Sequence, residues 1–149
     1  MLYTIGDAAK ELGIPASALR YYDKEGLLPH MNRSGSGIRM FTEDDFEWVR
    51  FIERLKKSGM PIKEIKSYID LYEQGDATLP QRRELIHARR EAVERELERL
   101  QETLQFVTYK CWYYDKALEL GSEEAVKAIP ADELPDDIRA IKARCGVSK

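Results

Sequence analysis

Apolar and polar positions near the start of the chain repeat with the spacing of two short helices. Steps of three and four separate the first apolar set, which is typical of one face of an α-helix: Ile5, Ala8, Ala9 and Leu12. Gly13 and Pro15 end this pattern, and a second short helix is predicted from roughly Ala16 to Lys24. The sequence therefore predicts two short helices joined by a tight turn.

The second of these helices has one polar face, whose members are spaced at i, i+3, i+4 and i+7: Ser17, Arg20, Tyr21 and Lys24. Leu19 and Tyr22 lie on a neighbouring face, and Tyr22 could reach either way. A helix-turn-helix of this kind presents its second helix to the major groove of DNA. A helical hairpin whose polar face is merely solvated is the alternative that this stretch leaves open.

A basic hairpin is predicted after the two helices. Between Met31 and Phe41, Arg33 and Arg39 alternate with Gly35 and Gly37, separating short extended pieces. This pattern is typical of a flexible wing that lies along the phosphate backbone of DNA.

Positive charge is concentrated locally, although the chain as a whole has a formal net charge of -3. Between Trp48 and Ile69, six basic residues oppose only Glu53 and Glu64, a local balance of +4: Arg50, Arg54, Lys56, Lys57, Lys63 and Lys66. Such a concentration suits phosphate contacts, which contribute affinity without reading sequence.

A long helix is predicted from Gln81 to about Leu120, a stretch without proline or glycine that spans about 60 Å at 1.5 Å per residue. Its apolar stripe comprises Ile86, Val93, Leu97, Leu100, Leu104, Val107, Cys111, Tyr114 and Leu118. After Val93 the steps alternate four and three, which is the seam of a coiled coil. A lone helix would leave this seam in water, so we expect a homodimer that places two recognition helices on a pseudo-palindromic site. Four arginines near the start are expected to face solvent or the N-terminal domain: Arg82, Arg83, Arg89 and Arg90.

A second apolar face lies near the end of the long helix, formed by Phe106, Tyr109 and Tyr113 with Trp112 beside them. The segment SEEAVKAIP can form a short amphipathic helix that covers this face, and the partner subunit's N-terminal domain is the alternative cover. Packing is one interpretation of the cluster. The other is an effector pocket for an apolar or aromatic compound.

Cys111 also has two interpretations. It lies on the seam, where a thiol packs as a small apolar group, or it senses a thiol-reactive effector. Metal sensing is the weaker alternative, because Cys145, His30 and His87 lack metal-ligand spacing to it.

The composition and motifs also favour a cytoplasmic protein that is not an enzyme. The two cysteines fit a reducing compartment, and the sequence contains neither a signal peptide nor an apolar run long enough for a membrane. It has no phosphate-binding loop or nucleophile arrangement, and we expect no cofactor. The acidic runs EDD and PDD are interpreted as a helix start and a solvated tail.

The order of these segments resembles the DNA-binding domain of the MerR (mercury-resistance regulator) family of bacterial transcription factors. The resemblance covers Leu2 to Gly75 and includes YTIGDAAKELGIPASALRYYDKEGLLP, a wing ending in IRMF, the helix start TEDDF, and KSGMPIKEIKSYI. It implies DNA contacts from the second helix and the wing: Arg20, Tyr21, Tyr22, Arg33 and Arg39. The chain has Phe41 where the family usually ends the wing with tyrosine, and Pro61 where many members have a serine cap.

The resemblance also implies an antiparallel dimerisation coiled coil and a mechanism. Members occupy a promoter in an inactive form, and an effector then tilts their DNA-binding domains and distorts the DNA so that RNA polymerase can engage it. We therefore expect a mainly α chain with a winged helix-turn-helix at 1–75, a hinge and dimerisation helix at 76–120, and a short helical C-terminal effector or packing segment at 121–149. The alternatives are a coiled-coil adaptor whose basic surface binds an acidic protein, and a DNA-binding protein with a purely architectural role.

Overall fold

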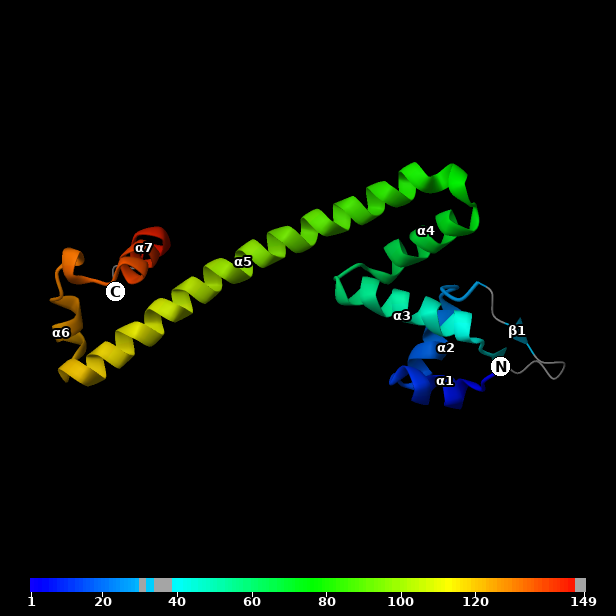
Figure 1. The fold of residues 1–149 in the computed structure, drawn as a ribbon, viewed down its shortest axis with the longest axis horizontal. Coiled ribbons are helices and arrows are strands. Elements are labelled where there is room, and N and C mark those ends of the chain that lie inside the picture. Colours follow the sequence, from blue (N-terminus) through cyan, green and yellow to red (C-terminus); the bar gives the residue numbers. More distant parts are fainter. Residues whose placement is uncertain (30–31, 34–38, 147–149) are drawn as a thin grey trace. The chain divides into compact units, whose positions relative to one another are not determined.

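The computed structural model describes residues 1–29, 32–33 and 39–146, and the chain divides into two compact units, Met1–Val93 and Glu94–Lys149 (Figure 1). The first unit contains α1 (Ile5–Leu12), α2 (Ala16–Lys24), β1 (Asn32–Arg33), β2 (Arg39–Met40), α3 (Glu43–Lys57), α4 (Ile62–Glu73) and η1 (Asp76–Thr78). The long helix α5 (Leu79–Leu120) begins in the first unit and continues into the second, followed by α6 (Glu123–Lys127), η2 (Ala131–Glu133) and α7 (Asp136–Cys145). The predicted mainly helical fold, with two short helices, a long helix and a helical tail, is confirmed.

Local signals in the sequence set the ends of α1 and α2. Thr4 caps α1 by accepting the Asp7 backbone N–H at 3.2 Å, and the Asp7 carboxylate accepts the Thr4 backbone N–H at 3.1 Å. Gly13 ends the helix in a left-handed conformation with φ 67°, which glycine adopts without a steric penalty. Pro15 then occupies the N-cap of α2. The tight turn of the helix-turn-helix therefore follows from residues within the turn itself.

The described part of the wing is a short antiparallel pair of strands. Asn32 pairs with Met40, and Arg33 pairs with Arg39. A bridge from Tyr3 to Phe41 fixes the base of the wing, through two backbone hydrogen bonds of 2.8 Å each. The predicted glycine-containing tip, Gly35 and Gly37, and also His30, lie outside the described residues.

The core of the first unit joins the helix-turn-helix to α3 and α4. Its fully buried side chains include Tyr22, Phe41, Leu19, Leu27, Ile52, Ile65, Ile69 and Val49. The predicted acidic helix start is confirmed, because Thr42 caps α3 in a reciprocal box with Asp45. Pro61 precedes α4 and offers no side-chain cap, as expected.

Two arginines at the start of α5 attach this helix to the first unit. Arg82 donates to Thr78 Oγ1 at 3.2 Å and to the Gly75 carbonyl at 3.1 Å, and its guanidinium lies over the Tyr72 ring. Arg89 donates to the Ser58 carbonyl at 3.4 Å. Arg82 and Arg89 thus face the N-terminal domain, whereas Arg83 and Arg90 are exposed to solvent, so each of the two expected alternatives holds for two of the four arginines.

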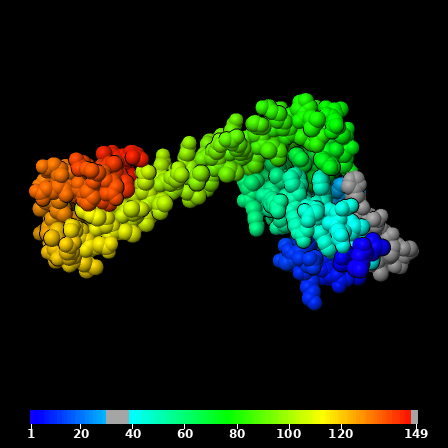
Figure 2. All heavy atoms as spheres, viewed as in Figure 1, coloured from blue at the N-terminus to red at the C-terminus, as the bar shows by residue number. Residues whose placement is uncertain are grey.

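The apolar seam of α5, called the α5 stripe below, faces solvent in the single chain. Its members are Ile86, Val93, Leu97, Leu100, Leu104, Val107, Cys111, Tyr114 and Leu118, all of them exposed. Figure 2 shows the α5 side chains as the green-to-yellow spheres. The α5 stripe is therefore available to another helix.

The tail covers Tyr109, Trp112 and Tyr113 of the second apolar face of α5, as predicted, but it leaves Phe106 of that face 42% exposed. Tyr109 and Tyr113 are buried against Val126 of α6 and Ile138 of α7. The Tyr113 hydroxyl donates to Glu123 at 3.0 Å, and burial together with this carboxylate raises the pKa of Tyr113 to about 12. This hydroxyl therefore remains a proton donor at neutral pH.

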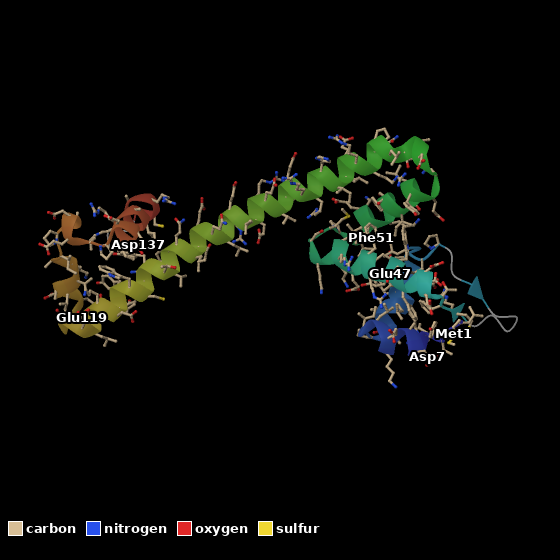
Figure 3. The ribbon with its side chains drawn as sticks, viewed as in Figure 1. Met1, Asp7, Glu47, Phe51, Glu119 and Asp137 are labelled. Carbon is tan, nitrogen blue, oxygen red and sulfur yellow. The ribbon has the colours of Figure 1, made fainter. Side chains whose placement is uncertain are left out.

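The PDD run is exposed to solvent, as interpreted, but it also begins a helix, which that interpretation missed. Asp136 and Asp137 form the first turn of α7, where their negative charges favour the positive end of the helix dipole (Figure 3). Ile138 follows them and is 3% exposed. Ile138, together with the partly buried Ile141, anchors α7 to this cluster, and the sequence pattern alone did not single out either residue.

Replacing Ile138 by alanine should release α7 while leaving the first unit intact. Removing this buried side chain costs about 2–5 kcal/mol of packing. Hydrogen exchange should show faster exchange at α6 and α7 with unchanged rates in α1 to α4. Ala140→Ser, on the exposed side of α7, is the control, and equal protection in both variants would contradict the anchoring role.

Candidate nucleic-acid interface

The polar face of α2 is exposed as the sequence predicts. Four side chains of this face are open to solvent: Ser17, Arg20, Tyr21 and Lys24. The opposite side of the helix buries Leu19 completely. The interface is therefore a rigid helix surface with two positive charges, a hydroxyl and an aromatic ring, a set that suits groove edges and phosphates.

Tyr22 is not part of this face, which corrects the expectation that it contacts DNA. Its side chain is 0% exposed. The hydroxyl donates to the Glu53 carboxylate and accepts from Lys56 Nζ at 3.0 Å. Burial, followed by the Glu53 hydrogen bond, raises the pKa of Tyr22. Tyr22 therefore fastens α2 to α3, and its i+3 spacing from Leu19 was the signal that could have shown it.

Arg39 connects the wing to α2. Its guanidinium forms an ion pair with Asp23, whose side chain is 11% exposed. The arginine side chain itself is 29% exposed, so part of it still faces solvent. Asp23 was not identified from the sequence, because nothing in the local pattern links the end of α2 to a strand after the hairpin. The side chain of Arg33, the other predicted wing contact, lies outside the described atoms.

Basic residues of α3 adjoin the turn of the helix-turn-helix. A cleft of about 450 Å³ is lined on one side by the turn and on the other by α3: Leu12, Gly13, Ile14, Val49, Arg50, Glu53, Arg54 and Lys57. Arg50 pairs with Glu47 at 2.6 Å, on the helix labelled at Glu47 in Figure 3. Arg54 and Lys57 are exposed. Basic side chains of α3 therefore adjoin the turn that precedes α2, in a chain that is acidic overall.

Other basic residues of the +4 segment are already engaged within the unit. Lys56 holds Tyr22, and Lys66 pairs with Asp70 one turn further along α4. The count of charges from the sequence therefore overstates the positive surface that faces a partner.

The second candidate site, at the end of α5, is mostly packed. Tyr109, Trp112 and Tyr113 come together with the tail, and about 80 Å³ remains among them. Phe106 is 42% exposed and Cys111 is also exposed, so neither belongs to this cluster. Among the described residues, no group of three His, Cys, Asp or Glu side chains is placed to hold a metal ion.

The fold and the exposed face of α2 define a helix-turn-helix DNA-binding protein in which a long helix follows the helix-turn-helix domain along the chain. Two family models agree with this class: "MerR HTH family regulatory protein" matches residues 3–71, and "MerR, DNA binding" matches residues 46–107. An uncharacterised HTH-type transcriptional regulator from Haemophilus influenzae is 38% identical over 136 residues, which are 91% of this chain and 98% of that protein. The chain belongs to the MerR family of transcriptional regulators.

Solved structures show the same fold. HiNmlR, described as a MerR family regulator lacking the sensor domain and bound to promoter DNA, is 39% identical with a TM-score of 0.72. The match covers 84% of this chain and 99% of that one. A MerR family regulator from Bacillus thuringiensis is 36% identical with a TM-score of 0.64, covering 74% of this chain and 97% of that one.

The two adjacent tyrosines should behave differently when each loses its hydroxyl. Tyr22→Phe removes a buried hydrogen bond to charged groups and should lower the free energy of unfolding by about 1–3 kcal/mol. Tyr21→Phe removes an exposed hydroxyl and should change it by less than about 0.5 kcal/mol. Urea unfolding followed by circular dichroism measures both, and equal effects would show that Tyr22 does not anchor α2.

Proposed function

We propose that this protein binds a pseudo-palindromic promoter site as a homodimer and regulates transcription from it. The observation that supports this most is the exposed face of α2, a helix that Tyr22 fastens to α3, together with Arg54 and Lys57, which are exposed on α3. Arg20, Tyr21, Ser17 and Lys24 read or hold the major groove. Arg33 and Arg39 of the wing follow the phosphate backbone.

The homodimer follows from the α5 stripe. Apolar side chains that face water in one chain are covered when two such helices pair. Two-fold symmetry then presents α2 of each copy to one half of the DNA site. Each half-site contact can be weak, because the linked second contact occurs at high effective concentration.

Regulation is proposed to work through DNA shape. The family resemblance implies that the protein occupies its promoter, and that an effector changes the deformation of the DNA so that RNA polymerase engages it. A ligand produces such a change only if it binds one conformation better than the other. Activation of transcription, rather than repression, rests on this resemblance alone.

The effector, a small molecule or a thiol-reactive compound, is assigned to the end of α5. Only about 80 Å³ remains beneath the tail, so a drug-sized compound at Tyr109, Trp112 and Tyr113 would displace α6 or α7. Phe106 and Cys111, both exposed in the single chain, are the accessible members of the proposed effector set.

A regulatory role fits better than an adaptor or a catalyst. An adaptor would need the coiled coil and a basic patch, but not a helix-turn-helix that matches the MerR family over residues 3–71. We assign the protein to the cytoplasm, where bacterial DNA lies, with no catalytic activity and no cofactor. None of the described helices, α5 included, has the apolar length that crossing a bilayer requires.

Arg20→Ala should weaken binding to DNA from upstream of the protein's own gene by about 1–3 kcal/mol and leave the dimer intact. Arg99→Ala, an exposed arginine on α5 that pairs with Glu96, is the matched control. Fluorescence anisotropy at several salt concentrations measures the affinity, and sedimentation measures the mass.

Three results would count against this proposal in different ways. Wild-type protein without sequence-specific binding would refute the regulatory function. Undiminished binding by Arg20→Ala would show that α2 is not the reading surface. Loss of both binding and dimer would refute the division of the chain into reading and pairing parts.

A further inference from the structure

The small cavity between the end of α5 and the tail lies entirely within the second unit of the chain. Its volume is about 80 Å³. Because water occupies ~30 Å³ per molecule in the liquid, a ligand of a few non-hydrogen atoms fits there without moving a helix. Residues of α5, α6, α7 and the segment before α7 line it, among them Tyr109, Trp112, Val126, Lys127, Leu134 and Lys142.

Two aromatic side chains bring hydrogen-bond donors without acceptors to this cavity. Tyr109 is 4% exposed, and its hydroxyl has no hydrogen-bond partner among the residues that the structure describes. The indole N–H of Trp112, whose ring stacks beside Tyr109 at 6.2 Å between centroids, has none among them either. Burial raises the pKa of Tyr109, so its hydroxyl stays protonated at neutral pH. A ligand that accepts hydrogen bonds would satisfy both donors.

The charged side chains that line the cavity are both positive. Lys127 and Lys142 are lining residues, and neither forms an ion pair with a carboxylate in the described part of the chain. Lys110 adds a third positive charge, since its Nζ lies 5.1 Å from the centroid of the Tyr113 ring. The Glu123 carboxylate is engaged, because it accepts the Tyr113 hydroxyl at 3.0 Å. This combination of charges and donors favours an anion.

We infer that this cavity binds a small carboxylate such as acetate, whose oxygens accept from Tyr109 and Trp112 beside the two lysine ammonium groups. The apolar end of the anion packs against Val126 and Leu134, which are both buried. This inference rests on the proposed function and deepens it, because it names the chemical class of the effector at the end of α5.

A bound carboxylate would join the tail to α5. Its partners come from three helices, with the aromatic donors on α5, Lys127 on α6 and Lys142 on α7. The anion therefore stabilises the packed tail relative to an open one, and this difference in affinity is what an effector requires.

The indole N–H signals of the two tryptophans report binding in the whole protein and contain their own control. Trp112 lines the cavity, whereas Trp48 lies in the first unit and donates to the Leu27 carbonyl at 2.9 Å. Acetate replaces chloride up to about 0.1 M at constant ionic strength, so that the screening of exposed charges stays the same. The Trp112 signal in a nitrogen–proton spectrum should shift to saturation while the Trp48 signal stays in place. Trp112→Phe assigns the signals.

Three matched compounds define what the cavity recognises. Acetamide has nearly the shape of acetate without its charge, pivalate carries the carboxylate on a bulkier group, and phosphate lacks the apolar end. Each should shift the Trp112 signal much less than acetate does. An equal response to acetamide would overturn the recognition of charge, an equal response to pivalate the limit on size, and an equal response to phosphate the choice of a carboxylate. The absence of a saturable shift with acetate would overturn the site itself.

Paired variants test the residues assigned to the anion. Tyr109→Phe removes one donor to a charged group and should weaken acetate binding about 10-fold. Tyr114→Phe, at an exposed tyrosine of the same helix, is its control. Lys142→Gln should also weaken binding, and Lys116→Gln, at a lysine that pairs with Glu119 at 2.7 Å, should not. Unchanged acetate affinity in Tyr109→Phe or in Lys142→Gln would overturn the role of that residue.

A second measurement separates this inference from the proposed function. Acetate binding is measured without DNA, so its failure would leave promoter binding untouched. Fluorescence energy transfer between the ends of the promoter site measures the DNA deformation, which saturating acetate should change with the wild type and not with Tyr109→Phe. Acetate binding without any change in the DNA would overturn the effector role of the anion. Wild-type protein that binds acetate without specific DNA binding would instead refute the regulatory function.

Discussion

The apolar side chains along α5 face water in the single chain, and covering them organises the rest of the protein. Nonpolar surface of this length is costly in water, and a second α5 is the cover that matches its spacing. In the proposed dimer, pairing also determines how many copies of α2 contact the DNA. The first unit provides a rigid α2, and pairing through the α5 stripe gives the proposed dimer its two-fold symmetry. The proposed regulation changes the orientation of the two DNA-binding domains in that dimer.

Local patterns in the sequence predicted much of this arrangement. The spacing of apolar residues gave α1 and α2, and the turn between them followed from Gly13 and Pro15. The unbroken helical composition and the alternating steps gave α5 and its stripe. These features depend on neighbours within a turn or two of helix, so they are visible without knowledge of the fold.

The remaining features depend on contacts between residues far apart in the chain. Tyr22 was expected to reach DNA, but Glu53 and Lys56 of α3 hold its hydroxyl inside the core. Asp23 and Arg39 meet only because the wing folds back on α2. Ile138 was overlooked because its partners lie on α5. When a residue lies at the border between two faces of a helix, contacts with residues distant in the sequence decide which way its side chain points. The spacing of apolar residues along the helix carries no information about those contacts.

The central claim is that reading DNA requires pairing through the α5 stripe. The most direct measurement compares Leu100→Glu with Leu100→Met by sedimentation and by binding to the promoter site, at equal folded content by circular dichroism. The account predicts that the glutamate variant is monomeric and loses specific binding, while the methionine variant keeps both properties. A monomeric Leu100→Glu protein that binds the site as tightly as the wild type would contradict the claim.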